Sequence, residues 1–136
     1  MASRLNPYLN FESNAREAME FYQSVLGGTL GIMTFGQMYP GDEATADLIM
    51  HSFLETPDGF TLMGSDTPPG TEFTPPGGVQ ISLTGNDERL RDYFVGLSAG
   101  GTVSMPLEKQ VWGDEFGQFV DRFGVGWLVN LSAPQE

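Results

Sequence analysis

The feature that most constrains the fold of this 136-residue chain is an internal repeat. Each half contains an alternating apolar stretch, a helical stripe that ends at paired glycines, and further short apolar runs. The matches between the halves keep the same order: Asn14 with Asn86, Phe21-Tyr22 with Tyr93-Phe94, Gly27-Gly28-Thr29 with Gly100-Gly101-Thr102, and Thr56-Pro57-Asp58-Gly59 with Asp121-Arg122-Phe123-Gly124. Each half is therefore expected to consist of a strand, a helix and three further strands.

Hydrophobic spacing predicts where these elements lie. Asn14 and Asn86 are expected to be the N-caps of the two helices, and Glu17 is expected to complete a capping box in the first. The two helical stripes are Ala15, Ala18, Met19, Tyr22, Val25 and Leu26, and then Leu90, Tyr93, Phe94 and Leu97. Strands are expected over 5–11, 29–35, 47–55, 60–64, 79–83, 102–105, 117–123 and 127–131. Loops are expected over 36–46 and 106–115.

A segment rich in proline and glycine separates the halves. Residues 67–78 contain four Pro and three Gly, which is typical of a linker. The length of the chain suits one domain, or two small modules that pack together. We therefore expect a single domain over 1–136, with module one over 1–66, the linker over 67–78 and module two over 79–136.

Charge and composition limit the classes of partner. The net charge of −12 disfavours nucleic acid, whose phosphates it would repel, and favours a cationic over an anionic small molecule. The same charge could serve solubility alone. The absence of Cys excludes a disulfide framework and thiolate chemistry. The first residues lack the apolar region of a signal peptide, and no apolar run has membrane-spanning length, so a cytoplasmic protein without membrane contacts is expected.

Several stretches resemble one known superfamily. The repeated βαβββ pattern, with FYQSVLGG ending the first helix and TPDG before a strand, is similar to the vicinal oxygen chelate superfamily, which includes glyoxalase I, extradiol dioxygenases and the bleomycin and fosfomycin resistance proteins. Three stretches of this chain resemble the PhnB-like subgroup more narrowly: LNPYLNFESNAREAMEFY, IMHSFLE and PLEKQVWGDEFGQFVDRFGVGWLVN. Members of that subgroup often carry a methyltransferase name for ubiquinone synthesis. This chain has no glycine-rich cofactor loop between a strand and a helix, and little room for a cofactor domain.

The resemblance implies an α+β fold with a ligand cavity. Two tandem βαβββ modules would form a cup-shaped, mostly antiparallel sheet with the helices outside, and superfamily members generally dimerise so that modules of different chains complete each cup. In metal-binding members the ligands are His, Gln or Glu on the first and last strand of each module. The corresponding positions here are Tyr8, Met63, Gln80 and Asn130. Thioether, neutral phenol and amide groups are poor ligands for a borderline divalent ion, so neither a metal nor another cofactor is expected.

Other candidates complete the expected ligand site. Asn10 alternates with the apolar face of the first strand and is expected to face the cavity with Tyr8, although Asn6 could take the place of Tyr8. His51, the only His, could be a general base or a ligand-contacting donor, or a strand His bonded to a neighbour. Trp112 and Phe116 could stack on a flat ligand or anchor a loop. The acids at 42, 43, 47, 114 and 115 are expected to be solvated loop charges.

These observations predict a homodimer that binds a small organic molecule, neutral or cationic, without a metal. The sequence identifies no reaction, so it leaves open whether the chain is an enzyme. One alternative is a metal-dependent lyase or dioxygenase of the same superfamily. Another is a dimerisation module whose cavity is vestigial.

Overall fold

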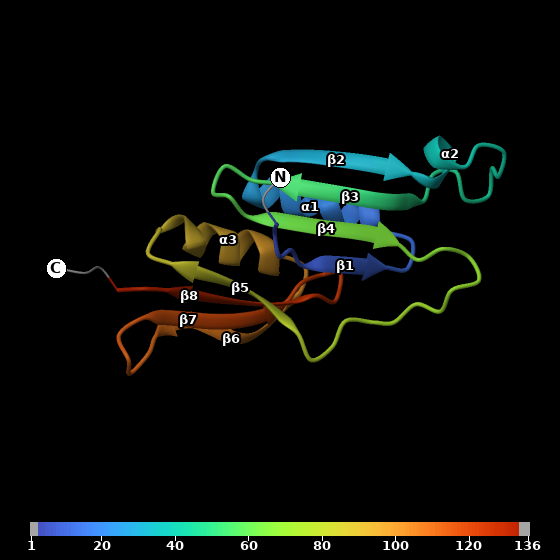
Figure 1. Ribbon diagram of the computed structural model, residues 1–136. Coiled ribbons are helices and arrows are strands. Elements are labelled where there is room, and N and C mark those ends of the chain that lie inside the picture. The colour runs from blue at the N-terminus through green and yellow to red at the C-terminus, as the bar shows by residue number, and fades with distance from the viewer. Residues whose placement is uncertain (1–2, 134–136) are drawn as a thin grey trace. The chain divides into compact units, whose positions relative to one another are not determined.

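The computed structural model describes residues 3–133, which form two four-stranded sheets (Figure 1). The chain divides into two compact units between Pro75 and Pro76, within the segment expected to be a linker. The outermost residues of the two predicted modules, 1–2 and 134–136, lie outside the described range.

The first unit has the predicted order of strands and helix. Its elements are β1 (Tyr8–Phe11), α1 (Ala15–Leu26), β2 (Thr29–Thr34), α2 (Phe35–Met38), β3 (Ile49–Glu55) and β4 (Thr61–Asp66). The strands lie in the order β1-β4-β3-β2, with β1 parallel to β4 and the other pairs antiparallel. Helix α1 contacts β2, β3 and β4.

The second unit repeats this arrangement. Its elements are β5 (Gln80–Gly85), α3 (Arg89–Ser98), β6 (Thr102–Lys109), β7 (Glu115–Val120) and β8 (Gly126–Leu131). The order is β5-β8-β7-β6, again with one parallel pair, β5 with β8, and two antiparallel pairs. The α+β class and the duplicated βαβββ module are therefore confirmed.

Each core forms between one helix and one face of its own sheet. The buried apolar residues of the first unit are Phe11, Ala15, Ala18, Met19, Tyr22, Leu26, Ile49, Leu54 and Leu62. Those of the second are Leu83, Leu90, Tyr93, Phe94, Leu97, Phe119, Val125, Trp127, Val129 and Leu131. Both predicted helical stripes are buried, except that Val25 is only half-buried. Because strand side chains alternate between faces, each sheet also has an open face, away from its helix.

Turns confirm the repeat at atomic detail. The Thr56 amide donates to the Phe60 carbonyl, and the Asp121 amide donates to the Val125 carbonyl. In each turn the side chain of the first residue also accepts a backbone N–H, from Phe60 or Val125. Gly28 and Gly101 occupy matching positions, where a Cβ atom would lie 2.1 Å from the Glu55 carbonyl oxygen and 2.2 Å from that of Val120, respectively. Only glycine allows such close backbone approach.

The predicted helix caps are only partly correct. Asn14 occupies the N-cap position of α1 as predicted, but its side chain makes no cap hydrogen bond, so the predicted capping box with Glu17 does not form. The Ala15 amide donates instead to Asp66 Oδ1 at 2.8 Å, from the end of β4. Asn86 does not cap α3, which starts at Arg89, and the Arg89 amide donates to Asp87 Oδ1 at 2.9 Å. Carboxylates are therefore the side chains that accept the first helical amides in both units.

Some element boundaries also differ from the prediction. The loop expected over 36–46 begins within α2, a single turn held by a capping box between Thr34 and Gln37. The loop expected from residue 106 is wrong, because β6 continues through Pro106 to Lys109. Proline fits there since β6 is an edge strand and its pairing with β7 shifts register between Met105 and Glu108. Within residues 3–133, none of the helices combines the length and apolar composition that crossing a bilayer requires.

Candidate functional site

The open face of the first sheet carries four of the residues expected to contact a ligand. Alternation in β1 buries Phe11 towards the helix and leaves Tyr8 and Asn10 exposed on the other face. Met63 lies directly opposite Tyr8 in the parallel β1–β4 ladder. His51, on β3, is half-buried and bonded to Tyr8, which places it on the same face.

Tyr8 and His51 form a stacked, hydrogen-bonded pair. Their ring centroids are 5.8 Å apart with an interplanar angle of 26°. Tyr8 Oη lies 3.2 Å from His51 Nδ1, and which of the two donates depends on the imidazole tautomer. Asn6 has a different contact, because its side-chain oxygen accepts a hydrogen bond from the Thr61 hydroxyl. Tyr8 remains 45% exposed, so its ring is accessible from this face.

The open face of the second sheet carries the other expected site residues. Gln80 on β5 is exposed, and its Nε2 donates to Gln118 Oε1 on β7 at 3.0 Å. Phe116 and Asn130 are opposite partners in the β7–β8 ladder. Trp112, in the turn between β6 and β7, packs edge-on against Phe116 with ring centroids 5.9 Å apart. Trp112 is 58% exposed.

Asp114 fixes the orientation of Asn130. Asn130 Nδ2 donates to Asp114 Oδ2 at 3.0 Å, and the Ala133 amide donates to Asp114 Oδ1 at the same distance. These two bonds, with that from Asn130 the larger cause, hold the pKa of Asp114 below its ordinary value of 3.8. Asp114 lies in the predicted loop and is charged, but its carboxylate is held by these two bonds and is not a free solvated group. Since its amide donates to Asp114, Asn130 presents its oxygen as the group available to a ligand.

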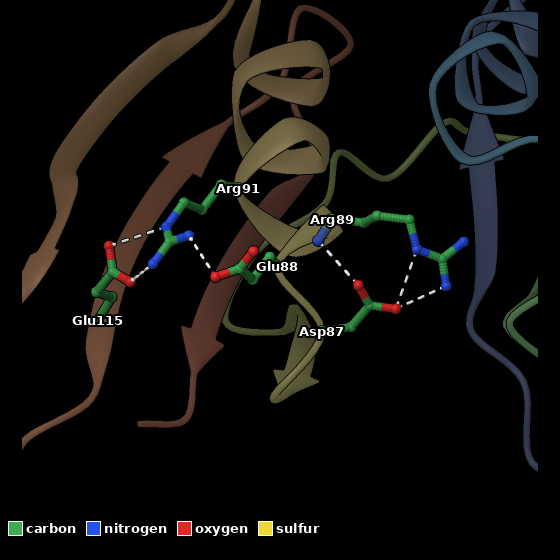
Figure 2. A network of polar contacts seen from close by, with 5 residues as sticks. All are labelled: Asp87, Glu88, Arg89, Arg91 and Glu115. Atoms are coloured by element: carbon green, nitrogen blue, oxygen red, sulfur yellow. Dashed lines mark hydrogen bonds and ion pairs between the residues drawn. The ribbon is translucent and has the colours of Figure 1, made fainter. Parts of the chain in front are cut away.

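Arginines of α3 are engaged by carboxylates (Figure 2). Arg91 Nε and Nη2 donate to the two oxygens of Glu115, and Arg91 Nη1 lies 3.5 Å from Glu88 Oε1. The hydrogen bond between Arg91 and Glu115 raises the pKa of Arg91 and lowers the pKa of Glu115. Arg89 Nε donates to Asp87 Oδ2 at 3.0 Å. The side-chain hydrogen bonding from Arg89 is the largest cause of the lowered pKa of Asp87. Glu115 lies on β7 and is paired with Arg91, so the prediction of a solvated loop charge is wrong for this residue.

A pocket of about 610 Å³ lies beside this ion-pair network. It is lined by residues at the start of α3, by the β6–β7 turn and by the end of β8, including Asn86, Arg91, Lys109, Glu115 and Leu131. Leu131 is a core residue, and Glu115 faces α3 through Arg91. This pocket is therefore on the helix side of the second sheet and not on the open face that carries Phe116 and Asn130.

The four residues that the resemblance places at metal-ligand positions do not fit a divalent metal. They offer a phenol and a thioether in the first unit, and two side-chain amides in the second. Gln80 and Asn130 are already oriented by Gln118 and Asp114, and the one imidazole is bonded to Tyr8. Zinc, iron and manganese prefer imidazole and carboxylate ligands. No group of three or more His, Asp or Glu residues placed to hold a metal occurs within the described range 3–133.

Three polar residues of the second open face were not among the expected ligand contacts. Glu108 lies opposite Phe116, and Gln118 lies opposite Leu128. Asp114 reaches this face through Asn130. Gln118 could have been found from its alternation with Phe119, whereas Glu108 fell in the segment predicted to be a loop.

Comparison with known proteins identifies the family. The chain matches the family described as 3-demethylubiquinone-9 3-methyltransferase over residues 3–130. It is 29% identical to Protein YjdN of Escherichia coli, across 96% of this chain and 97% of that protein. Its fold is similar to that of protein PA1353 from Pseudomonas aeruginosa, with a TM-score of 0.86 and 38% identity over 96% of this chain and 98% of the other.

Two further structures extend the comparison. A putative 3-demethylubiquinone-9 3-methyltransferase, PhnB protein, from Bacillus cereus has a TM-score of 0.71 and 26% identity, covering 96% of this chain and all of the other. A glyoxylase/bleomycin resistance protein/dioxygenase domain from Frankia sp. EAN1pec is 15% identical with a TM-score of 0.62, covers 100% of this chain and 96% of the other, and supports the fold alone. The chain belongs to the PhnB-like family, described as 3-demethylubiquinone-9 3-methyltransferase, and its fold is similar to that of a glyoxylase/bleomycin resistance protein/dioxygenase domain.

Proposed function

We propose that this chain binds a small, partly aromatic organic molecule, neutral or cationic, on the open faces of its sheets without a metal. The observation that carries the proposal is that aromatic pairs lie outside both cores: Tyr8 with His51 in the first unit and Trp112 with Phe116 in the second. Each pair is accompanied by hydrogen-bonding groups on the same face. Stacking on such rings favours a flat ligand, and the polar groups would fix its orientation.

The charges of the chain favour a ligand that carries no phosphate, phosphonate or carboxylate group. The chain has eighteen acids and six bases. Arg89 and Arg91 are bonded to carboxylates, and the Arg122 guanidinium donates to the Ala99 carbonyl. None of these three groups is placed to clamp a phosphate or carboxylate on an open face. The proposal therefore disfavours phosphonates.

The proposal is tested by thermal-shift screening of chelator-treated protein. Cationic aromatic, neutral aromatic and phosphonate compounds are compared at low and high salt. We expect the largest stabilisation from the first two classes, and we expect Tyr8→Leu and Trp112→Leu to weaken it. Tyr39→Leu is a matched control, since Tyr39 is 67% exposed and lies outside the sheets. A phosphonate as the tightest binder would refute the charge argument.

Metal analysis separates this proposal from the alternative of a metal-dependent lyase or dioxygenase. Protein purified without chelator is expected to contain no stoichiometric zinc, nickel, manganese or iron. A stoichiometric metal that is lost in a Gln80→Ala variant would contradict the proposal and favour the metal-dependent alternative.

A further inference from the structure

A carboxylate lies beside the aromatic pair of the second open face. Glu108 and Phe116 are opposite partners in the β6–β7 ladder, so their side chains point to the same side of the sheet. Phe116 in turn packs against Trp112, whose indole is more than half exposed. The Glu108 side chain is exposed, and it has no ion-pair or hydrogen-bond partner within residues 3–133.

The other charges of the second unit leave this face negative. Asp114 reaches it through Asn130 and stays ionised at neutral pH. The arginines of α3 are bonded to Asp87 and Glu115, as Figure 2 shows. Lys109 is opposite Glu115 in the ladder, which places its ammonium on the helix side of the sheet.

We propose that the cluster of Glu108, Trp112 and Phe116 binds the cationic end of the ligand, a quaternary or protonated amine. The indole and phenyl rings would provide faces for a cation–π contact, and the Glu108 carboxylate would supply the counter-charge. Asn130, held by Asp114, presents its oxygen to an amine N–H at the same face. This inference rests on the proposed function and narrows its ligand from neutral or cationic to cationic.

The indole of Trp112 provides a direct readout. The only other tryptophan, Trp127, is fully buried and stacked on Phe119, so an added probe should quench the fluorescence of Trp112 selectively. Phenyltrimethylammonium and its neutral isostere tert-butylbenzene have the same shape and differ in charge. We expect the cation to bind wild-type protein more tightly, with an affinity that falls as salt rises.

Variants locate the counter-charge. Glu108→Gln is expected to weaken binding of the cation by about fivefold, the size of a partly exposed charge contact, without changing binding of the neutral probe. Asp92→Asn is the matched control, because it removes the same charge from α3, which packs on the other face of this sheet. It should change neither affinity. Circular dichroism verifies that both variants are folded.

The possible results separate this inference from the proposed function. Equal binding of both probes, or a Glu108→Gln variant that binds the cation like wild type, overturns the inference and leaves the proposed function standing. Equal losses in Glu108→Gln and Asp92→Asn also overturn it, since they would reflect net charge alone. If neither probe binds and the compound screen finds no other binder, both proposals are refuted.

Discussion

In each unit one buried aspartate accepts hydrogen bonds from N–H groups of segments that are distant along the chain or follow a turn. Asp66 is buried and accepts the amides of Ala15 and Ile49, each at 2.8 Å, so it joins the start of α1 to the start of β3. Asp121 is also buried and accepts the Trp127 indole N–H at 2.9 Å. Both carboxylates satisfy donors that would otherwise be buried without a partner.

The pH response of Asp114 tests the polar arrangement at the second open face. In Asn130→Ala, the main cause of the lowered pKa is removed, so the pKa of Asp114 is expected to rise towards 3.8. Since the folded-state pKa is depressed, the stabilisation from this carboxylate is present above its ordinary pKa and is lost as pH falls through the lowered value. NMR titration of the Asp114 carboxyl in both proteins measures this change. An unchanged pKa in the variant would show that Asn130 is not the cause.

Residue alternation predicted which side chains lie on the open faces, but not how they interact. It placed Tyr8 and Asn10 opposite the buried Phe11, and Gln80 away from the core, whereas the position of Asn130 was implied by the resemblance to the family; the structure has all four on the open faces. It could not predict the Tyr8–His51 contact, because the two residues are 43 positions apart.

At the scale of elements, local signals predicted the helices better than their caps. Hydrophobic spacing gave the full length of α1, because the stripe that it marks packs against β2, β3 and β4. The cap comes from Asp66, which is 51 positions from Ala15 and is brought there by the parallel pairing of β1 with β4. A capping pattern read from adjacent residues cannot include such a partner.

A pair of substitutions tests the origin of this cap. Asp66→Ala is expected to lower the free energy of unfolding by about 2–4 kcal/mol, because two buried amides lose their acceptor. Asn14→Ala is the matched control and should change it by less than about 0.5 kcal/mol, since its side chain makes no cap bond. Urea denaturation of both variants gives the comparison. A larger loss in Asn14→Ala would restore the local capping prediction.

At the scale of the whole chain, the duplicated module was predictable because its signals recur in order. The paired glycines, the helical stripes and the turns at Thr56 and Asp121 mark equivalent points of both units. The extension of β6 was missed because proline normally ends a strand, and the register shift that admits it depends on pairing with β7.

We expect the chain to form a homodimer. The edge strand β6 is exposed almost throughout and carries Val103 and Met105, whose side chains are accessible, and such edges are usually covered. Light scattering at micromolar concentration should return a mass of twice 14.8 kDa. A single species of 14.8 kDa would contradict this prediction, and Val103→Lys is expected to shift the equilibrium towards it.

The central claim is that an organic ligand binds the open sheet faces without a metal. Its most direct test is NMR chemical-shift mapping of chelator-treated protein with the best binder from the thermal-shift screen. We expect saturable shifts at Tyr8, His51, the Trp112 indole and the Asn130 side-chain amide. Shifts confined to α1 and α3, or binding that requires an added divalent metal, would contradict the account.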